Sequence, residues 1–271
     1  MPREEIKPWL RTRFFPHIWC PGCGHGIILH AILRSLVDLG KTREETVIAS
    51  GIGCSSRMPG YINANTVHTT HGRSLGFATG IKLANPALTV IDVMGDGDCT
   101  AIGGNHFIHA CRRNIDITAI VMNNNIYGMT GGQASPTTPV GARATTAPYG
   151  AIDTPFDICR LAEGAGASYV ARASIAQPVL CEQYIKKGIQ KKGFSVVEIM
   201  THCHTQFGRR NKRPNPVDNL NFFKENSIPK AKAKEMTEEE KKGKIIIGEF
   251  VDREAQEYTE AYLKLIERVR G

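Results

Sequence analysis

Short apolar runs alternate with longer amphipathic stretches along most of this chain. The apolar runs at 46–50, 88–94, 117–122 and 194–200 are rich in β-branched residues and predict strands. The stretches at 26–39, 72–84 and 103–113 carry apolar residues at helix spacing. Strands that alternate with helices predict an α/β fold with a mostly parallel sheet and helices on both faces. Ligands of such sheets bind at the carboxyl ends of the strands.

The character of the sequence changes after Cys203. Segment 209–244 is rich in Lys, is interrupted by Pro and has few apolar residues, which predicts an extended segment that wraps the surface or is partly disordered. An amphipathic helix is predicted after it, because one helical face collects Tyr258, Ala261, Tyr262, Leu265 and Val269. We therefore divide the chain into a main domain, residues 1–205, and a C-terminal extension, residues 206–271.

The length of the chain, its N-terminal sequence and its net charge limit the classes of protein to which it can belong. The 271 residues suffice for one large domain. The N-terminus is charged from Arg3 onward, and no apolar run approaches membrane-spanning length, so we expect a cytoplasmic protein that does not enter a membrane. The net charge of +8 would suit an acidic partner. The basic residues are dispersed without interleaved aromatic residues, which disfavours nucleic acid as that partner.

The chain has 8 cysteines, and a reducing compartment does not favour a disulfide framework. Cys20 and Cys23 form a C-x-x-C ahead of a predicted helix, a pattern typical of zinc sites, redox dithiols and iron-sulfur ligands, and also of two buried thiols. Four others lie in or beside predicted helices and are expected to be buried; these are Cys99, Cys111, Cys159 and Cys181.

Two polar motifs follow neighbouring predicted strands. "GDGD" occupies 95–98, and "NNN" occupies 123–125. The interval between them fits one crossover helix, so both motifs should emerge side by side at one edge of the sheet. The carboxylate of Asp96, the amide oxygen of Asn124 and the main-chain carbonyl of Ile126 predict a Mg²⁺ site there, completed by diphosphate oxygens. The helix that begins near Asp98 would present its N–H groups to the same diphosphate.

A GDG followed by paired asparagines resembles the signature of the thiamine diphosphate-binding fold. Cys54 follows the first predicted strand in "GIGCSSR", and Cys203 follows the last. Together with Cys20 and Cys23 they come from three loops, and we predict that these four thiolates hold one [4Fe-4S] cluster. A four-cysteine zinc site would use the same donors but could not accept an electron.

The order of the motifs resembles the beta subunit of the 2-oxoacid:ferredoxin oxidoreductases over about the first two hundred residues. The motifs are "WCPGCGHG", "GIGCSSR", "HTTHGRSLGFATGIKLANP", "GDGD" and "NNNIYGMTGGQ". In that family the subunit joins a larger alpha subunit, a [4Fe-4S] cluster takes electrons from the thiamine cofactor, and coenzyme A takes the acyl group. The chain lacks the dense C-x-x-C-x-x-C run of the family's longer members, so we expect one cluster.

The resemblance implies roles for individual residues. His71 is expected to face the substrate or the diphosphate, or alternatively to cap the next helix. Arg57 is expected to bind the distal carboxylate of a dicarboxylic 2-oxoacid, or alternatively to form a surface salt bridge. No glutamate stands in a matching motif, so the carboxylate that activates thiamine is expected from the alpha subunit. The implied cofactor contacts are Ile52, Gly53, Cys54, Ser55, His71, Gly72, Arg73, Ser74, Gly95, Gly97, Asp98, Tyr127, Gly128 and Thr130.

The expected function is oxidation of 2-oxoglutarate to its acyl-CoA with reduction of ferredoxin, in a dimer of alpha-beta heterodimers. Pyruvate or a broad range of 2-oxoacids is the alternative substrate. A simple thiamine decarboxylase would need no set of four thiolates. A zinc-stabilised basic binding module is the alternative from another class.

A basic run follows Cys203, and we expect it to dock ferredoxin. It comprises Arg209, Arg210, Lys212 and Arg213. The alternatives are a solvated charge run, an arm that wraps the alpha subunit, or a site for coenzyme A phosphates.

Overall fold

A computed structural model describes residues 4–271 and contains one large sheet. Its strand order is β2-β1-β3-β4-β8-β7-β10-β9, and all neighbours run parallel except β10 and β7. The strands are β1 (Thr46–Ser50), β2 (Asn65–His68), β3 (Thr89–Gly95), β4 (Thr118–Asn123), β7 (Tyr169–Ser174), β8 (Ser195–Met200), β9 (Ser227–Pro229) and β10 (Ile245–Asp252). A separate ribbon pairs β5 (Ile126–Tyr127) with β6 (Gln133–Ala134). The predicted fold class is therefore confirmed.

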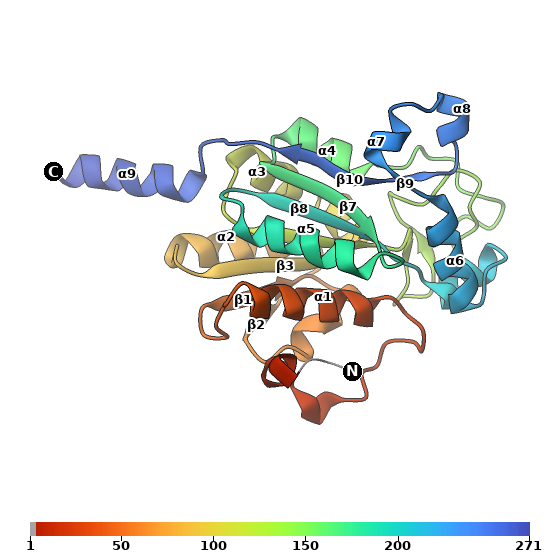
Figure 1. Ribbon diagram of the computed structural model, residues 1–271, viewed down its shortest axis with the longest axis horizontal. Coiled ribbons are helices and arrows are strands. Elements are labelled where there is room, and N and C mark those ends of the chain that lie inside the picture. Colours follow the sequence, from red (N-terminus) through yellow and green to blue (C-terminus); the bar gives the residue numbers. More distant parts are fainter. Residues whose placement is uncertain (1–3) are drawn as a thin grey trace.

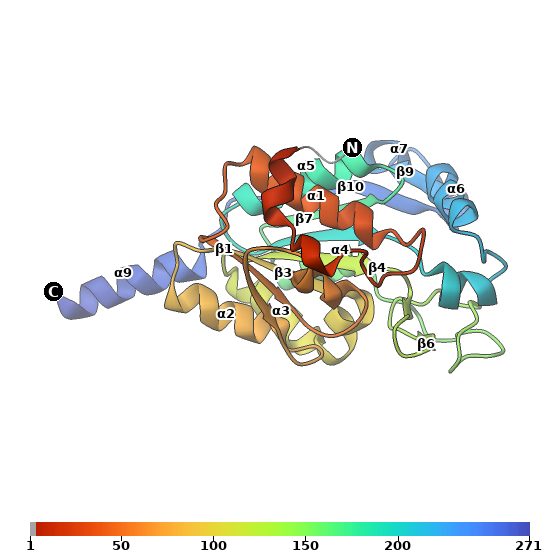
Figure 2. The ribbon, with the colours of Figure 1, turned by 90° about the horizontal axis from the view of Figure 1, so that it is seen from below.

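Helices cover both faces of the sheet (Figures 1 and 2). One face carries α1 (His25–Asp38) and α5 (Pro178–Gln190). The other face carries α2 (Ser74–Ala84), α3 (Gly104–Arg113) and α4 (Ile158–Ala165). Every residue of β4 and β8 is buried as a result, which explains why these strands appear in the sequence as continuous apolar runs. Shorter turns are η1 (Glu4–Trp9), η2 (Thr12–Phe14), η3 (Ser55–Gly60), η4 (Asp98–Ile102) and η5 (His204–Gly208).

The elements predicted from the main domain are present, with ends shifted by one or two residues. The four cysteines expected in or near helices, Cys99, Cys111, Cys159 and Cys181, are all buried, as predicted. Strands β2 and β7 were not predicted. β2 is short and largely polar, and β7 contains Arg172, so neither has the apolar run that the other strands show.

The C-terminal extension is more regular than its sequence indicates. It contains α6 (Pro216–Asn226), α7 (Lys230–Ala233) and α8 (Glu238–Lys241), and it adds β9 and β10 to the large sheet. Segment 209–244, expected to be extended or partly disordered, forms α6, α7, α8 and β9, and β9 joins the sheet through β10, which pairs antiparallel with β7. The division into two domains at residue 205 stays a prediction.

The predicted final helix is present as α9 (Tyr258–Arg270), which projects from one end of the body (Figure 1). Tyr258 packs against the core on the face covered by α2, α3 and α4, whereas Leu265 and Val269 are 43% and 76% exposed. Most of the predicted apolar face is therefore not packed within the described chain. Within residues 4–271, none of the helices is long and apolar enough to cross a membrane.

Candidate functional site

The loops that follow β1, β3, β4 and β8 lie at one edge of the sheet, because these strands are adjacent and parallel. Cys54, Asp96, Asn124 and Cys203 sit on these loops in that order. The loop that leads into α1 brings Cys20 and Cys23 to the same edge, where all four cysteines meet in one cavity. The predicted motifs are therefore brought together by the sheet.

One cavity, of about 220 Å³, is lined by Cys20, Cys23, Cys54 and Cys203. The backbone N–H of Cys23 donates to the carbonyl of Cys20 at 2.9 Å, so the C-x-x-C is a tight turn whose two thiols face the same space. The indole Nε1 of Trp19 fixes the Cys54 loop by donating to the Cys54 carbonyl at 2.7 Å. The structure thus assembles the four thiols that the sequence singled out.

Cys23 and Cys54 are held in a setting that disfavours free thiolates. Burial raises the pKa of Cys23 to about 12, a contact with His25 opposes this, and the nearby thiols of Cys54, Cys203 and Cys20 add to it. Burial likewise raises the pKa of Cys54 to about 11. His25 lies beside this group and makes a local hydrogen bond, with Nδ1 2.9 Å from the Cys23 sulfur. A positively charged group in the cavity would stabilise the thiolates against burial and against the repulsion between neighbouring thiolates.

A second cavity, of about 100 Å³, adjoins the first, and Cys54, Asn124 and Gly128 line both. Most of the predicted cofactor contacts line it: Ile52, Gly53, Cys54, Ser55, His71, Gly95, Gly97, Asp98, Tyr127, Gly128 and Thr130. Gly72, Arg73 and Ser74 are not in its lining. Arg73 instead donates to His106 Nε2 at 3.0 Å, and Ser74 is buried at the start of α2.

Asp96 is buried at this cavity with its two oxygens in different settings. Oδ2 accepts hydrogen bonds from Ser135 Oγ at 2.5 Å and Thr137 Oγ1 at 2.7 Å, whereas Oδ1 has the Asn124 N–H at 3.4 Å. Burial raises the pKa of Asp96, and these donors oppose the rise. Oδ1 is therefore the oxygen left to bind a cation. Asn124 and Ile126 line the same cavity.

Asp98 ties three loops of the cavity wall together. Its Oδ1 accepts from His71 Nδ1 at 2.5 Å, from the Gly72 N–H at 2.6 Å and from the Ile52 N–H at 3.4 Å. Gly51 packs so closely that a Cβ there would lie 2.0 Å from Asp98 Oδ2. Because His71 bonds Asp98 and no side chain caps α2, the alternative of a helix-capping His71 is wrong.

Arg57 is exposed at the rim of the four-cysteine cavity. Within residues 4–271 it has no carboxylate partner, so the salt-bridge alternative finds no support in the described chain.

Two cations of the basic run already have partners inside the fold. Arg210 donates to the Gly131 carbonyl at 3.3 Å, and the Arg213 guanidinium lies 3.8 Å from the centre of the Phe222 ring. Arg209 and Lys212 are exposed. These two are therefore the cations of the run that a partner can reach most directly.

Several residues of the site were missed by sequence reasoning. Ser135 and Thr137 belong to a polar "SPTT" stretch that follows the asparagine motif, and nothing local in the sequence indicates that it folds back onto Asp96. The clustering of hydroxyl residues after a predicted ligand loop was the one signal available.

The chain was compared with known protein families and structures. Residues 51–199 match the family described as "Thiamine pyrophosphate enzyme, C-terminal TPP binding domain". The 2-oxoglutarate synthase subunit KorB of Methanocaldococcus jannaschii is 54% identical over 263 residues, which cover 97% of each chain. The KorB subunit of Archaeoglobus fulgidus is 56% identical over 224 residues, 83% of this chain and 82% of that one.

A solved structure matches the whole fold. It is the 2-oxoglutarate:ferredoxin oxidoreductase of Magnetococcus marinus with 2-oxoglutarate, coenzyme A and succinyl-CoA bound. The TM-score is 0.87 at 33% identity, and the match covers 100% of this chain and 92% of that chain. By sequence and by fold, this chain belongs to the thiamine diphosphate-dependent 2-oxoacid:ferredoxin oxidoreductases, as a beta subunit of the 2-oxoglutarate synthase type.

Proposed function

We propose that this chain is the beta subunit of an enzyme that oxidises 2-oxoglutarate to its acyl-CoA on thiamine diphosphate and passes the electrons through one [4Fe-4S] cluster to ferredoxin. The observation that carries the proposal is the pair of adjoining cavities, one lined by four cysteines and the other by the GDGD and NNN loops. Relatives named 2-oxoglutarate synthase favour 2-oxoglutarate over pyruvate as the substrate. Membership of an oxidoreductase family removes the zinc-stabilised binding module as an alternative.

The second cavity fits the diphosphate end of the cofactor. Asp96 Oδ1, the side-chain oxygen of Asn124 and the Ile126 carbonyl would hold Mg²⁺, a cation that prefers such oxygen ligands. Gly95 and Gly97 leave backbone close to the space, and Ser55 and His71 line its wall. When bound, thiamine diphosphate supplies the electron sink for decarboxylation. The chain's own part is to bind and orient it.

The site is incomplete in one chain. A cavity of about 100 Å³ is small against the roughly 300–1,000 Å³ typical of sites for drug-sized ligands. No glutamate of the described residues lines it. Both facts support an alpha subunit that covers the rest of the cofactor and contributes the activating carboxylate. The assembly that we propose for the two subunits is a dimer of alpha-beta heterodimers. The free thiols also fit a reducing cytoplasm.

The spacing of the four cysteines favours a cluster over a single zinc ion. Zinc–sulfur bonds of about 2.3 Å in a tetrahedron require sulfurs roughly 3.8 Å apart. Among residues 4–271, one group brings three possible ligand atoms within 4.8 Å of one another, and that group contains none of these four cysteines. The thiols instead surround a cavity of about 220 Å³, which suits a larger inorganic group.

The cluster assignment is tested with single Cys→Ala variants of the complex with its alpha subunit, purified without oxygen. Cys20, Cys23, Cys54 and Cys203 variants should lose iron and visible absorbance. Cys111→Ala, which removes a buried thiol of α3, is the matched control and should keep both. Full iron content in Cys203→Ala would overturn the assignment.

The Mg²⁺ assignment is tested with Asp96→Ala. This change removes the carboxylate ligand and should abolish Mg²⁺-dependent retention of thiamine diphosphate, while iron content stays unchanged. Bound cofactor is measured by fluorescence after oxidation to thiochrome. Native thiamine content in Asp96→Ala would reject the proposed Mg²⁺ site.

A further inference from the structure

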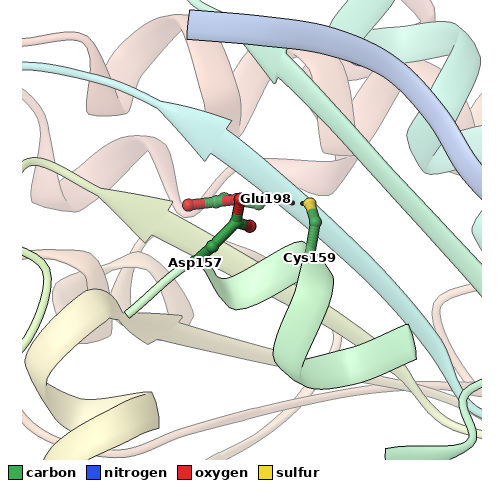
Figure 3. A group of neighbouring side chains, drawn as sticks. All are labelled: Asp157, Cys159 and Glu198. Atoms are coloured by element: carbon green, nitrogen blue, oxygen red, sulfur yellow. Dashed lines mark hydrogen bonds between the residues drawn. The ribbon is translucent and has the colours of Figure 1, made fainter. Parts of the chain in front are cut away.

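A polar cluster lies between α4 and the sheet, outside the lining of both cavities. Cys159 and Glu198 are buried in it, whereas the Asp157 side chain is 40% exposed. Asp157, Cys159 and Glu198 bring their possible ligand atoms within 4.8 Å of one another (Figure 3). The ligand types suit a cation, but Arg172 already supplies one. Its Nε lies 2.6 Å from Glu198 Oε2, and one of its terminal nitrogens lies 2.5 Å from Asp157 Oδ1. The cluster is therefore an internal ion-pair network and not a metal site.

The Arg172–Glu198 pair is fully bonded although it is buried. Arg172 on β7 and Glu198 on β8 are paired in register, and they are 8% and 1% exposed. The remaining terminal nitrogen of Arg172 donates to the Ile246 carbonyl at 3.3 Å. Burying such a pair costs desolvation energy, and apolar residues of similar volume often stabilise a fold as well or better. Stability alone therefore does not explain this ion pair, and the residues that it holds in place offer another explanation.

The second oxygen of Glu198 points toward the asparagine motif. Glu198 Oε1 accepts from Asn123 Nδ2 at 2.7 Å, since Asn123 ends the neighbouring strand β4. This bond fixes the orientation of the Asn123 amide. Its oxygen then faces the other way, where it accepts from the Asn125 N–H at 3.0 Å and lies 3.1 Å from Thr137 Oγ1.

The Asn123 amide helps to position Asn124 and Asp96, the two proposed Mg²⁺ ligands that bind through side-chain oxygens. Asn124 lies inside the turn that Asn123 closes, and Asn125 adopts a left-handed backbone there with φ of 61°. Asn125 Nδ2 also donates to the Thr137 carbonyl at 2.6 Å, which ties the turn to the loop that carries Thr137. That loop in turn orients Asp96 through its hydroxyl bond to Oδ2.

We propose that Arg172 and Glu198 are positioning residues for the Mg²⁺ site: they lock the Asn123 amide, and the locked amide orients Asn124 and Asp96. The inference rests on the proposed function, because it takes Asp96 and Asn124 as ligands. It assigns a task to a buried charge pair that touches neither cofactor cavity.

The test variant is Glu198→Gln, which keeps the side-chain volume. Arg172 would draw the glutamine oxygen, so the glutamine NH₂ would face the NH₂ of Asn123 and the amide lock would be lost. Adding Asn123→Asp restores an acceptor opposite the glutamine, and the second carboxylate oxygen still accepts from the Asn125 N–H. A second variant, Asn123→Ala, removes the amide and leaves the ion pair intact.

The measurement is thiamine diphosphate retained by the alpha-beta complex as a function of Mg²⁺ concentration, with iron content and melting temperature recorded in parallel. Outer-shell partners of metal ligands typically contribute 10- to 100-fold in metal affinity. We expect the Mg²⁺ concentration for half-retention to rise about tenfold or more in Glu198→Gln and in Asn123→Ala. It should return toward the native value in the double variant. Iron content should not change.

Cys159→Ala is the matched control, because its thiol lies 3.3 Å from the same Glu198 carboxylate but does not contact Asn123. It should leave the Mg²⁺ dependence unchanged. Native Mg²⁺ dependence in both Glu198→Gln and Asn123→Ala, or an equal shift in Cys159→Ala, overturns the inference. If Asp96→Ala also keeps native Mg²⁺ dependence, the proposed Mg²⁺ site itself has failed; if Asp96→Ala loses it, only the positioning role has failed.

Discussion

At the scale of single residues, Asp92 shows how a buried carboxyl makes the stability of the fold depend on pH. It is fully buried on β3, and burial raises the pKa of its carboxyl to about 8, with the Ser74 hydroxyl opposing and the Asp98 charge adding to the rise. The unfolded chain releases this proton near pH 4, whereas the folded chain keeps it to about pH 8. The folded state therefore binds more protons between these values, and stability falls there by about 1.4 kcal/mol per pH unit as pH rises.

Asp92→Asn is predicted to remove this pH dependence, because the amide has the same shape and no charge to desolvate. Near pH 4 the variant and the unchanged protein should have similar melting temperatures. Toward pH 8 the melting temperature of the variant should exceed that of the unchanged protein by a growing margin. Melting temperatures measured across this range check the prediction, with the exposed Asp153→Asn as control. A difference between variant and unchanged protein that does not vary with pH would contradict it.

Arg57 carries the prediction on substrate choice. As an exposed cation at the rim of the four-cysteine cavity, it is placed to bind the distal carboxylate of 2-oxoglutarate, which pyruvate lacks. Arg57→Leu should raise KM for 2-oxoglutarate far more than KM for pyruvate. The binding energy lost with 2-oxoglutarate should be roughly 1.5–3 kcal/mol, the contribution of a charged hydrogen bond. Steady-state kinetics with both substrates test this, and Arg113→Leu, at an exposed position on α3, is the control. Equal changes for both substrates would rule out a role in selectivity.

The sequence revealed residues whose chemistry shows locally and hid those whose partners are distant. Asp96, Asn124 and the cysteines are polar residues directly after apolar runs, so their convergence followed from the rule for parallel strands. Glu198 and Arg172 lie within strands, and their pairing depends on the register of β7 and β8. A glutamate within the apolar run 194–200 was a visible signal, but its partner lies on a strand that the pattern did not predict.

At the scale of elements, the same limit explains the C-terminal extension. The three isoleucines of β10 follow a long Lys-rich stretch, and their strand forms because β7 offers a free edge. Because this strand pairing depends on β7, which is distant in the sequence, the residues around β10 show no local pattern that predicts it. The helix α9 was predictable from its periodicity, but where it packs was not.

Glu257 is predicted to anchor α9 to the body. Its buried side chain accepts from the N–H groups of Thr259 and Glu260, which caps the helix, and from the N–H of Asp116 ahead of β4. Glu257→Ala should cost about 1 kcal/mol, as the loss of a helix cap usually does. Hydrogen exchange in 258–270 should quicken while the central strands stay protected. The exposed Glu267→Ala on the same helix is the control, and equal exchange in both variants would contradict the anchoring role.

At the scale of the whole molecule, electrons must leave the four-cysteine cavity toward a partner, and the exposed cations of the basic run that follows Cys203 are Arg209 and Lys212. They follow Cys203 and η5, whose residues His204, Thr205 and Gln206 line the cavity. Ferredoxins are usually acidic, so two exposed positive charges there would speed docking without altering the chemistry. The internal bonds of Arg210 and Arg213 make those two unsuitable for a test, since changing them would disturb the fold.

Reversing both exposed charges, in Arg209→Glu with Lys212→Glu, is predicted to lower kcat/KM for ferredoxin about tenfold at low salt and to remove most of its ionic-strength dependence. Turnover with a small viologen dye and KM for coenzyme A should not change, because neither requires a docked protein. Reversal of Lys232 and Lys234, exposed on and beside α7, is the control and should leave the ferredoxin kinetics nearly unaltered. Parallel losses with dye and with ferredoxin would instead assign the run to subunit assembly, and a raised KM for coenzyme A would assign it to the acyl acceptor.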